Sequence, residues 1–168
     1  DVTTNDCDSD ITVDLVKLAE YPYQPIKECR GIPTKIPDLD YLIEGFKPGD
    51  VTIIAGRPSM GKTDVMIHLA LQAGWADCLP IIFSLEMDRQ KIIWRLVTNC
   101  GKINRLKLRD PQKYFTEKQL EQWVPVLERV NEARVQIDDR SGITVQQIRT
   151  KARKLIRMNP TKKPIIFI

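Results

Sequence analysis

Apolar positions along this chain follow two alternating patterns. Continuous apolar runs occur at 51–55 ("VTIIA"), 79–85 ("LPIIFSL") and 164–168 ("PIIFI"), and "ARVQI" at 133–137 is a further strand candidate. Continuous runs of this length are typical of strands that are buried on both faces, as in a parallel sheet. The sequence therefore predicts four strands, each separated from the next by a longer segment.

The intervening segments place apolar residues three or four positions apart, which predicts amphipathic helices. The first helix is expected over 63–76, and the second is expected to begin at Asp88, its expected cap. The third is expected to begin at the capping-box pattern "TEKQ" at 116–119, and the fourth is expected over 144–158. Pro125 should kink or split the third of these helices. The residues expected to face inward are Val65, Met66, Leu69, Ala70 and Ala73; Ile92, Ile93, Leu96 and Val97; Leu120, Trp123, Leu127 and Val130; and Val145, Ile148, Ala152, Leu155 and Ile156.

Strands that alternate with helices predict an α/β fold, in which helices flank a parallel, doubly wound sheet. Residues 11–20 ("ITVDLVKLAE") form a further short helical pattern, which "YPYQP" then interrupts. Two interpretations are equally open. The segment is either a linker helix outside the core or a terminal helix that packs on its own domain.

A phosphate-binding pattern follows the first strand. Residues 56–63 fit G-x-x-x-x-G-K-[ST], with a buried strand expected before them and a helix after them. Gly56 and Gly61 allow backbone N–H groups to approach phosphate, and the start of the helix attracts the same anion. Lys62 supplies a point charge to the β- and γ-phosphates, and Thr63 offers a hydroxyl to Mg²⁺. The nucleotide-binding residues expected from this motif are Gly56, Arg57, Pro58, Ser59, Met60, Gly61, Lys62 and Thr63.

Glu86 follows the second strand, in "FSLEM". Ligands of parallel α/β sheets bind at the carboxyl ends of the strands. If this strand is the neighbour of the strand at 51–55, the Glu86 carboxylate faces the γ-phosphate and can orient a water molecule. By spacing alone, a solvated loop glutamate is an equally good interpretation.

Composition and charge narrow the class of protein. The chain has 168 residues, 42% of them hydrophobic and 29% charged, which is typical of a folded domain and excludes a disordered chain. It has no apolar run long enough to span a membrane and no signal-peptide pattern, so a cytoplasmic protein is expected. The net charge of +4 permits a polyanionic partner without requiring one. The four cysteines, at positions 7, 29, 78 and 100, are expected to be reduced and mostly buried.

Three sequence segments resemble one family. "GIPTKIPDLDYLIEGFKPGDVTIIAGRPSMGKT", "IIFSLEM" and "IDDRSGITVQQIRTKARKL" are similar to the ATPase domain of DnaB-type replicative helicases, which has a RecA-like fold. The resemblance covers residues 31–168 and leaves residues 1–30 as a linker helix and N-terminal extension. Lys35 is a departure from the pattern, because the family usually has glycine there.

The resemblance implies specific roles for residues. Glu86 corresponds to the family's catalytic base, and Lys62 and Thr63 correspond to its cradle lysine and its Mg²⁺-binding threonine. The family often has an arginine at the position of Arg95. This side chain either approaches the phosphates or forms a surface ion pair.

The resemblance also implies partners and an activity. It implies an ATP hydrolase of a bacterial or phage-infected cell that works as a homo-hexameric ring on single-stranded DNA, with a primase and a helicase loader as further partners. It implies that the parent chain continues after Ile168 with an aspartate, and that the present chain by itself hydrolyses little ATP. The alternative is a RecA-like DNA-dependent ATPase that does not unwind DNA, such as a recombinase or an assembly switch. A nucleotide-binding module in which hydrolysis is incidental is a third possibility.

Three further features favour structural roles. Asp138 and Asp139 read as a strand end and loop in preference to a metal-binding pair. Arg149, Arg153 and Arg157 recur on one helical face, where a solvated surface is favoured over a DNA-binding stripe. His68 is assigned no catalytic role.

Overall fold

The computed structural model describes residues 15–16, 19 and 31–168. The described strands are β1 (Leu79–Phe83), β2 (Gln136–Asp138) and β3 (Pro164–Phe167). The helices of residues 31–168 are α2 (Pro37–Ile43), α3 (Lys62–Trp75), α4 (Arg89–Cys100), the 3₁₀ helix η2 (Arg105–Arg109), α5 (Pro111–Tyr114), α6 (Glu117–Glu121), α7 (Trp123–Glu132) and α8 (Val145–Met158).

The strands form a parallel sheet in the order β2-β1-β3, so the strand that comes first in sequence lies at the centre. In the register, Ile82 lies opposite both Ile137 of β2 and Phe167 of β3. All five residues of β1 are buried. The expectation of a parallel sheet flanked by helices is therefore confirmed.

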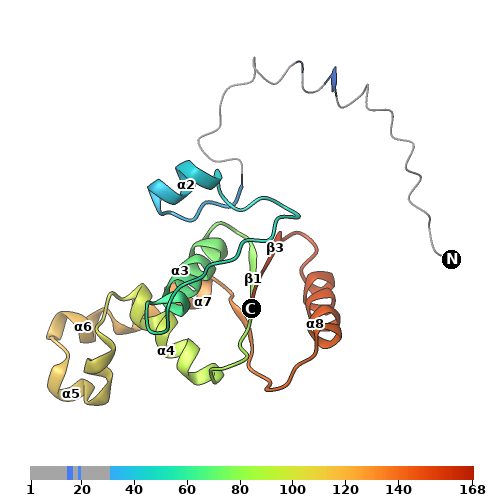
Figure 1. The fold of residues 1–168 in the computed structure, drawn as a ribbon. Helices are drawn as coiled ribbons and strands as arrows, with labels where there is room; N and C mark the ends of the chain where they lie inside the picture. Colours follow the sequence, from blue (N-terminus) through green and yellow to red (C-terminus); the bar gives the residue numbers. More distant parts are fainter. Residues whose placement is uncertain (1–14, 17–18, 20–30) are drawn as a thin grey trace.

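Side chains of β1 alternate between two hydrophobic clusters, one on each face of the sheet. Ile82 packs with Ile67 and Leu71 of α3 and with Ile92 and Leu96 of α4. On the other face, Leu79, Ile81 and Phe83 pack with Ala152 of α8. Figure 1 shows α8 on one side of the sheet and α3 and α4 on the other. Full burial of one such side chain contributes about 1.5–3 kcal/mol, which explains why β1 is apolar at every position.

The expected strand at 51–55 is not formed. This segment has no regular secondary structure, and Val51 and Ile53 are 88% and 86% exposed. The continuous apolar run correctly indicates a segment suited to burial, but a strand of a parallel sheet needs neighbouring strands to pair with. The described strands pair only with one another, so the expected burial on both faces is wrong for this structure.

The strand β3 also differs from expectation, because it pairs with β1 on one side only. Its burial alternates between exposed and half-buried positions, and Ile166 is 43% exposed. The prediction that this strand is buried on both faces is wrong, although its residues are apolar. The strand itself is present at the predicted place.

The helices begin where the sequence predicts. Thr116 and Gln119 form a complete capping box at the start of α6, and Thr144 and Gln147 form another at the start of α8. The helical segment that contains Pro125 is split at Gln122 into α6 and α7, as predicted. Pro125 then lies in the first turn of α7, where its missing N–H removes no helical hydrogen bond.

Most residues expected to face inward do so, but three are exposed: Leu120 of α6 (53%), Leu127 of α7 (40%) and Val145 of α8. Ile148 and Leu155 of α8 pack on the sheet, whereas Val145 is 79% exposed. Val145 is the first residue of α8 and directly follows the cap, so its side chain precedes the part of the helix that packs on β1.

The segment before the cradle is attached to α3 through His68. The Thr34 carbonyl oxygen lies 3.2 Å from His68 Nε2, and Thr34 is fully buried. The Asp40 carboxylate accepts hydrogen bonds from the backbone N–H groups of Thr34 and Lys35 at 2.7 Å and 3.0 Å. His68 therefore has a structural contact with the segment that precedes the cradle.

Expectations on the N-terminal segment fall mainly outside the described residues. Leu15, Val16 and Ala19 are helical and exposed, whereas Ile11 and Leu18 are not described.

Of the four cysteines, Cys7 and Cys29 lie outside the described residues. Cys78 is a buried free thiol and Cys100 is a half-buried one, and burial raises the pKa of both. No helix in the described part of the chain is long and apolar enough to cross a membrane.

Candidate functional site: a phosphate cradle and its acidic loop

The loop over residues 56–61 leads directly into the N-terminus of α3. Gly61 has φ 88°, a left-handed conformation that favours glycine, and it precedes the first helical residue. Ser59 is also left-handed, with φ 64°. The loop residues before Gly61 are exposed. The first backbone N–H groups of α3 have no partner within the helix, so they and the helix dipole favour an anion at this place.

The Lys62 ammonium folds back over the loop. It donates hydrogen bonds to the carbonyl oxygens of Gly56 at 2.9 Å and of Arg57 at 3.3 Å. The lysine is exposed, so it can exchange these contacts for phosphate oxygens without breaking the core. Thr63 is half-buried at the second position of α3. Gly56, Gly61, Lys62 and Thr63 thus lie together at one helix terminus.

Asp64 connects this terminus to two arginines. Its carboxylate oxygens lie 3.1 Å from Arg95 Nη1 and 3.1 Å from Arg105 Nη2. Arg95 is on α4 and Arg105 begins η2. The ion pair that the sequence left open for Arg95 is therefore present, and its partner is the residue next to Thr63. Sequence reasoning did not single out Asp64, because an acidic residue in a first helical turn is common.

Glu86 lies in the connection between β1 and α4, and its side chain is exposed. The hydroxyl of Ser84 donates to the Met87 carbonyl at 2.7 Å and accepts from the Met87 N–H at 3.0 Å. The Ser84 N–H donates to the Asp138 carbonyl at 2.8 Å. The backbone that follows Glu86 is thus attached to Ser84, which in turn is attached to β2.

Asp139 holds the other end of this connection. Its Oδ2 accepts a hydrogen bond of 2.8 Å from the backbone N–H of Arg89, the first residue of α4. Asp88 occupies the N-cap position, but its side chain makes no capping hydrogen bond and pairs with Lys91 instead. The expectation that Asp88 caps this helix is therefore correct in position but wrong for the side chain. A carboxylate that is distant in sequence supplies the cap, which no local pattern reveals.

Asp138 and Asp139 face different partners, as a strand end and loop would. The Asp138 side chain is 3% exposed and accepts from Arg140 Nη2 at 2.8 Å and from Lys151 Nζ at 2.7 Å. The Arg140 hydrogen bonds, followed by those of Lys151, hold the pKa of Asp138 well below its usual range, against the opposing effect of burial. Asp138 also raises the pKa of Arg140.

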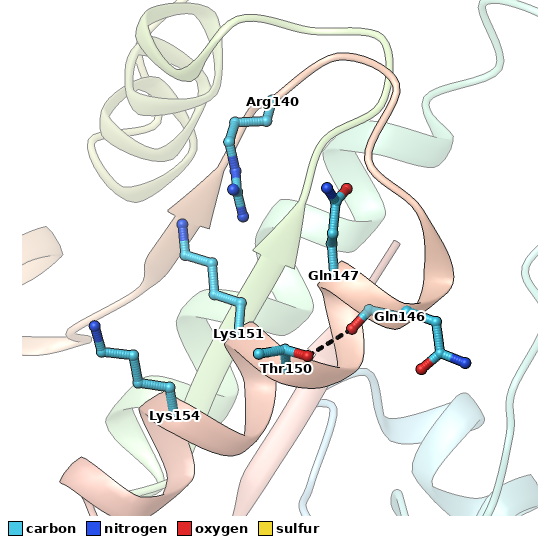
Figure 2. Close-up of a pocket in the computed structure, with 6 residues that line it drawn as sticks. All are labelled: Arg140, Gln146, Gln147, Thr150, Lys151 and Lys154. Carbon is cyan, nitrogen blue, oxygen red and sulfur yellow. Dashed lines mark hydrogen bonds between the residues drawn. The ribbon is translucent and has the colours of Figure 1, made fainter.

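Arg140 and Lys151 also line an open hollow of about 570 Å³ beside α8, together with Gln146, Gln147, Thr150 and Lys154. Figure 2 shows these six side chains, none of which belongs to the cradle. Arg149, Arg153 and Arg157 are exposed on the same helix. The hollow is therefore separate from the expected nucleotide site.

The structure does not join every expected part of the site. The neighbours of β1 are β2 and β3, so β1 does not pair with residues 51–55 and the condition set for Glu86 is not met. Within the described residues, no hydrogen bond or ion pair joins the Glu86 side chain to residues 56–63. Likewise, no group of three or more His, Cys, Asp or Glu side chains in the described part could hold a metal ion. The oxygen ligand available for Mg²⁺ at the cradle is the Thr63 hydroxyl, which fits an ion that a bound phosphate also coordinates.

Comparison with known proteins decides the family. Residues 31–168 match the family described as the DnaB-like helicase C terminal domain. The chain belongs to this family. Replicative DNA helicase DnaB of Nostoc sp. is 38% identical over 129 residues, which are 74% of this chain and 14% of that protein. Replicative DNA helicase DnaB of Buchnera aphidicola subsp. Baizongia pistaciae is 34% identical over 156 residues, which are 89% of this chain and 32% of that protein.

A solved structure agrees with this assignment. A DnaB-like replicative helicase, studied with its interactions with primase, superposes with a TM-score of 0.84 at 29% identity. The superposition covers 94% of this DnaB-like chain and 38% of the solved one. The resemblance to DnaB-type helicases and the RecA-like fold class are thereby confirmed. The DnaB-like chain spans at most about a third of the length of the Nostoc and Buchnera helicases.

Proposed function

We propose that this chain is the nucleotide-binding part of the motor of an ATP-dependent replicative DNA helicase. The observation that carries the proposal is the exposed GRPSMGKT loop at the N-terminus of α3, in a chain of the DnaB-like family. The parent protein couples ATP hydrolysis to movement along single-stranded DNA and to the separation of duplex DNA.

The proposed motor is larger than the described chain. The relatives are about three to seven times longer than the parts that match them. In addition, Val51, Ile53 and Ile54 form an exposed apolar segment directly before the cradle. Contiguous exposed apolar surface of this kind marks a contact with other protein surface. We infer that further parts of the parent protein cover this segment.

Each cradle group has a proposed task. The Lys62 ammonium leaves the carbonyls of Gly56 and Arg57 and binds the β- and γ-phosphates of ATP. The Thr63 hydroxyl coordinates Mg²⁺, which neutralises developing charge on the phosphates when it is bound. Glu86 accepts a proton from the attacking water, which it holds by a hydrogen bond. The shape of the loop comes from Arg57, Pro58, Ser59 and Met60. Arg95, which is paired with Asp64, supplies positive charge near the bound nucleotide.

The assembly is also part of the proposal. The parent forms a homo-hexameric ring around single-stranded DNA, with a primase and a helicase loader as further partners and the cytoplasm as its location. Residues 1–30 form a linker whose helix docks on a neighbouring subunit. The exposure of Leu15 and Val16, at 56% and 58%, supports a helix that is available to such a neighbour. Deleting residues 1–30 from the full-length protein should then reduce ring assembly and leave the ATPase domain folded.

The test of the main proposal is a duplex-unwinding assay with the full-length protein. Unwinding that needs hydrolysable ATP, and that is lost in Lys62→Ala and Glu86→Gln, is the expected result. DNA-dependent ATP hydrolysis without unwinding would contradict the helicase assignment and would favour a RecA-like ATPase of another kind. Unwinding that persists in Glu86→Gln would contradict the role of the glutamate alone.

A further inference from the structure

The connection from Ser84 to Asp88 carries Glu86 between β1 and α4, and it is fixed at both ends. At the first end, the Ser84 hydroxyl makes two hydrogen bonds with the backbone of Met87, of 2.7 Å and 3.0 Å. These bonds enclose Leu85 and Glu86 in a short turn. The Ser84 N–H is bound in addition to the Asp138 carbonyl.

At the second end, the carboxylate of Asp139 binds the Arg89 N–H at 2.8 Å. This N–H is one of the four at the start of α4 that have no partner within the helix. Because the Asp88 side chain does not supply the cap, Asp139 is the side chain that does. The position of α4 relative to the end of β2 therefore depends on this contact.

Both contacts attach the connection that carries Glu86 to the end of strand β2. Ser84 is bound to residue 138 and Arg89 to residue 139, which are the last residue of β2 and the one after it. The Glu86 side chain itself is exposed. The backbone of the turn sets the point from which this side chain extends, and the Ser84 hydroxyl and the Asp139 carboxylate hold that backbone at its two ends.

We propose that Ser84 and Asp139 are positioning residues that hold the Glu86 carboxylate where the attacking water must be. The inference rests on the proposed function of Glu86. Catalysis by an oriented base is sensitive to geometry, and a displacement of about 1 Å can lower the rate roughly 100-fold. Neither side chain touches the cradle residues through a described contact, so nucleotide affinity does not depend on them.

The Ser84 test compares two variants of the full-length protein. Ser84→Ala removes both hydrogen bonds, and kcat for ATP hydrolysis is expected to fall by roughly 10- to 100-fold, while KM and the Kd of a nonhydrolysable ATP analogue are unchanged. Ser84→Thr keeps a hydroxyl and should restore most of kcat. Equal losses in both variants, or a parallel rise of Kd, would overturn the inference for Ser84.

The Asp139 test uses the same readouts. Asp139→Ala removes the acceptor for the Arg89 N–H, whereas Asp139→Asn keeps a side-chain oxygen that can accept from it. A loss of kcat in Asp139→Ala that is largely reversed in Asp139→Asn is expected. If both variants instead lower the melting temperature and leave kcat unchanged in the folded protein, Asp139 is only a helix cap.

A double substitution separates this inference from the role of Glu86. If Ser84 acts through Glu86, Ser84→Ala should cause no further loss of kcat in the Glu86→Gln background. An additional loss in that background would show that Ser84 acts by another route. If Glu86→Gln alone hydrolyses ATP normally, the assignment of Glu86 fails first, and any effect of Ser84→Ala then contradicts the positioning role.

Discussion

Arg95 on α4 and Asp64 at the start of α3 form an ion pair with an Nη1–Oδ1 distance of 3.1 Å. The Arg95 side chain is 27% exposed and the Asp64 side chain 41%. Because Arg105 binds the other oxygen of the same carboxylate, two arginines compensate one negative charge beside the cradle. Arg95 is therefore held beside the cradle by its ion pair with Asp64.

The first prediction concerns this pair. Arg95→Ala should raise the Kd for ATP by no more than about fivefold, because a partly exposed ion pair contributes about 1 kcal/mol or less. The increase should be smaller at high salt, where such charges are screened. The double variant Arg95→Ala/Asp64→Asn should recover the original affinity in a nucleotide titration. Continued weak binding in the double variant would mean that Arg95 contacts the phosphates directly.

The second prediction concerns Lys62. Its contacts are with two loop carbonyls, so Lys62→Ala should remove Mg·ATP binding and leave the melting temperature without nucleotide unchanged. A ligand at 100 times its Kd stabilises a protein by about 2.7 kcal/mol, and thermal melts with and without nucleotide measure this shift. Lys118→Ala, at an exposed lysine of α6, is the matched control and should keep the shift. A shift that survives in Lys62→Ala would refute the cradle assignment.

The third prediction concerns Lys35, the position at which DnaB-type helicases usually have glycine. Its φ of 60° lies in the left-handed region, which costs a residue with a Cβ about 1–2 kcal/mol. Lys35→Gly should therefore stabilise the fold, by about 0.5–1 kcal/mol after the greater flexibility of glycine in the unfolded chain is included. Chemical denaturation measures the difference. A destabilised Lys35→Gly variant would show that the lysine side chain itself is needed.

The fourth prediction concerns Asp138 and pH. Hydrogen bonds from Arg140 and Lys151 lower the pKa of this carboxyl in the folded state, so its contribution to stability is complete above the unfolded pKa of about 4. That contribution is lost as the pH falls below this value. Asp138→Asn should destabilise the protein by about 1–3 kcal/mol at neutral pH, and the difference from the original chain should shrink below about pH 4. Denaturation curves over this pH range check it, and a difference that does not depend on pH would contradict it.

The sequence by itself determined the elements that depend on local patterns. Thr116 with Gln119, and Thr144 with Gln147, specify the start of a helix within four residues, and both capping boxes are formed. The five apolar residues of β1 predicted a strand covered on both faces, and the two hydrophobic clusters provide that cover. The motif at 56–63 likewise placed a glycine-rich loop before a helix, because its glycines and its helix start are adjacent in the chain.

Only the tertiary structure decided which distant groups meet. The pairing of β1 with β2 and β3, the exposure of Val51 and Ile53, the cap that Asp139 provides for α4, and the pairing of Arg95 with Asp64 all join residues far apart in sequence or depend on such contacts. An apolar run indicates that removing the segment from water lowers the free energy, but it does not indicate which surface will cover the segment. A carboxylate similarly has no sequence pattern that identifies a partner 50 residues away, because that partner is chosen by how the strands and helices pack.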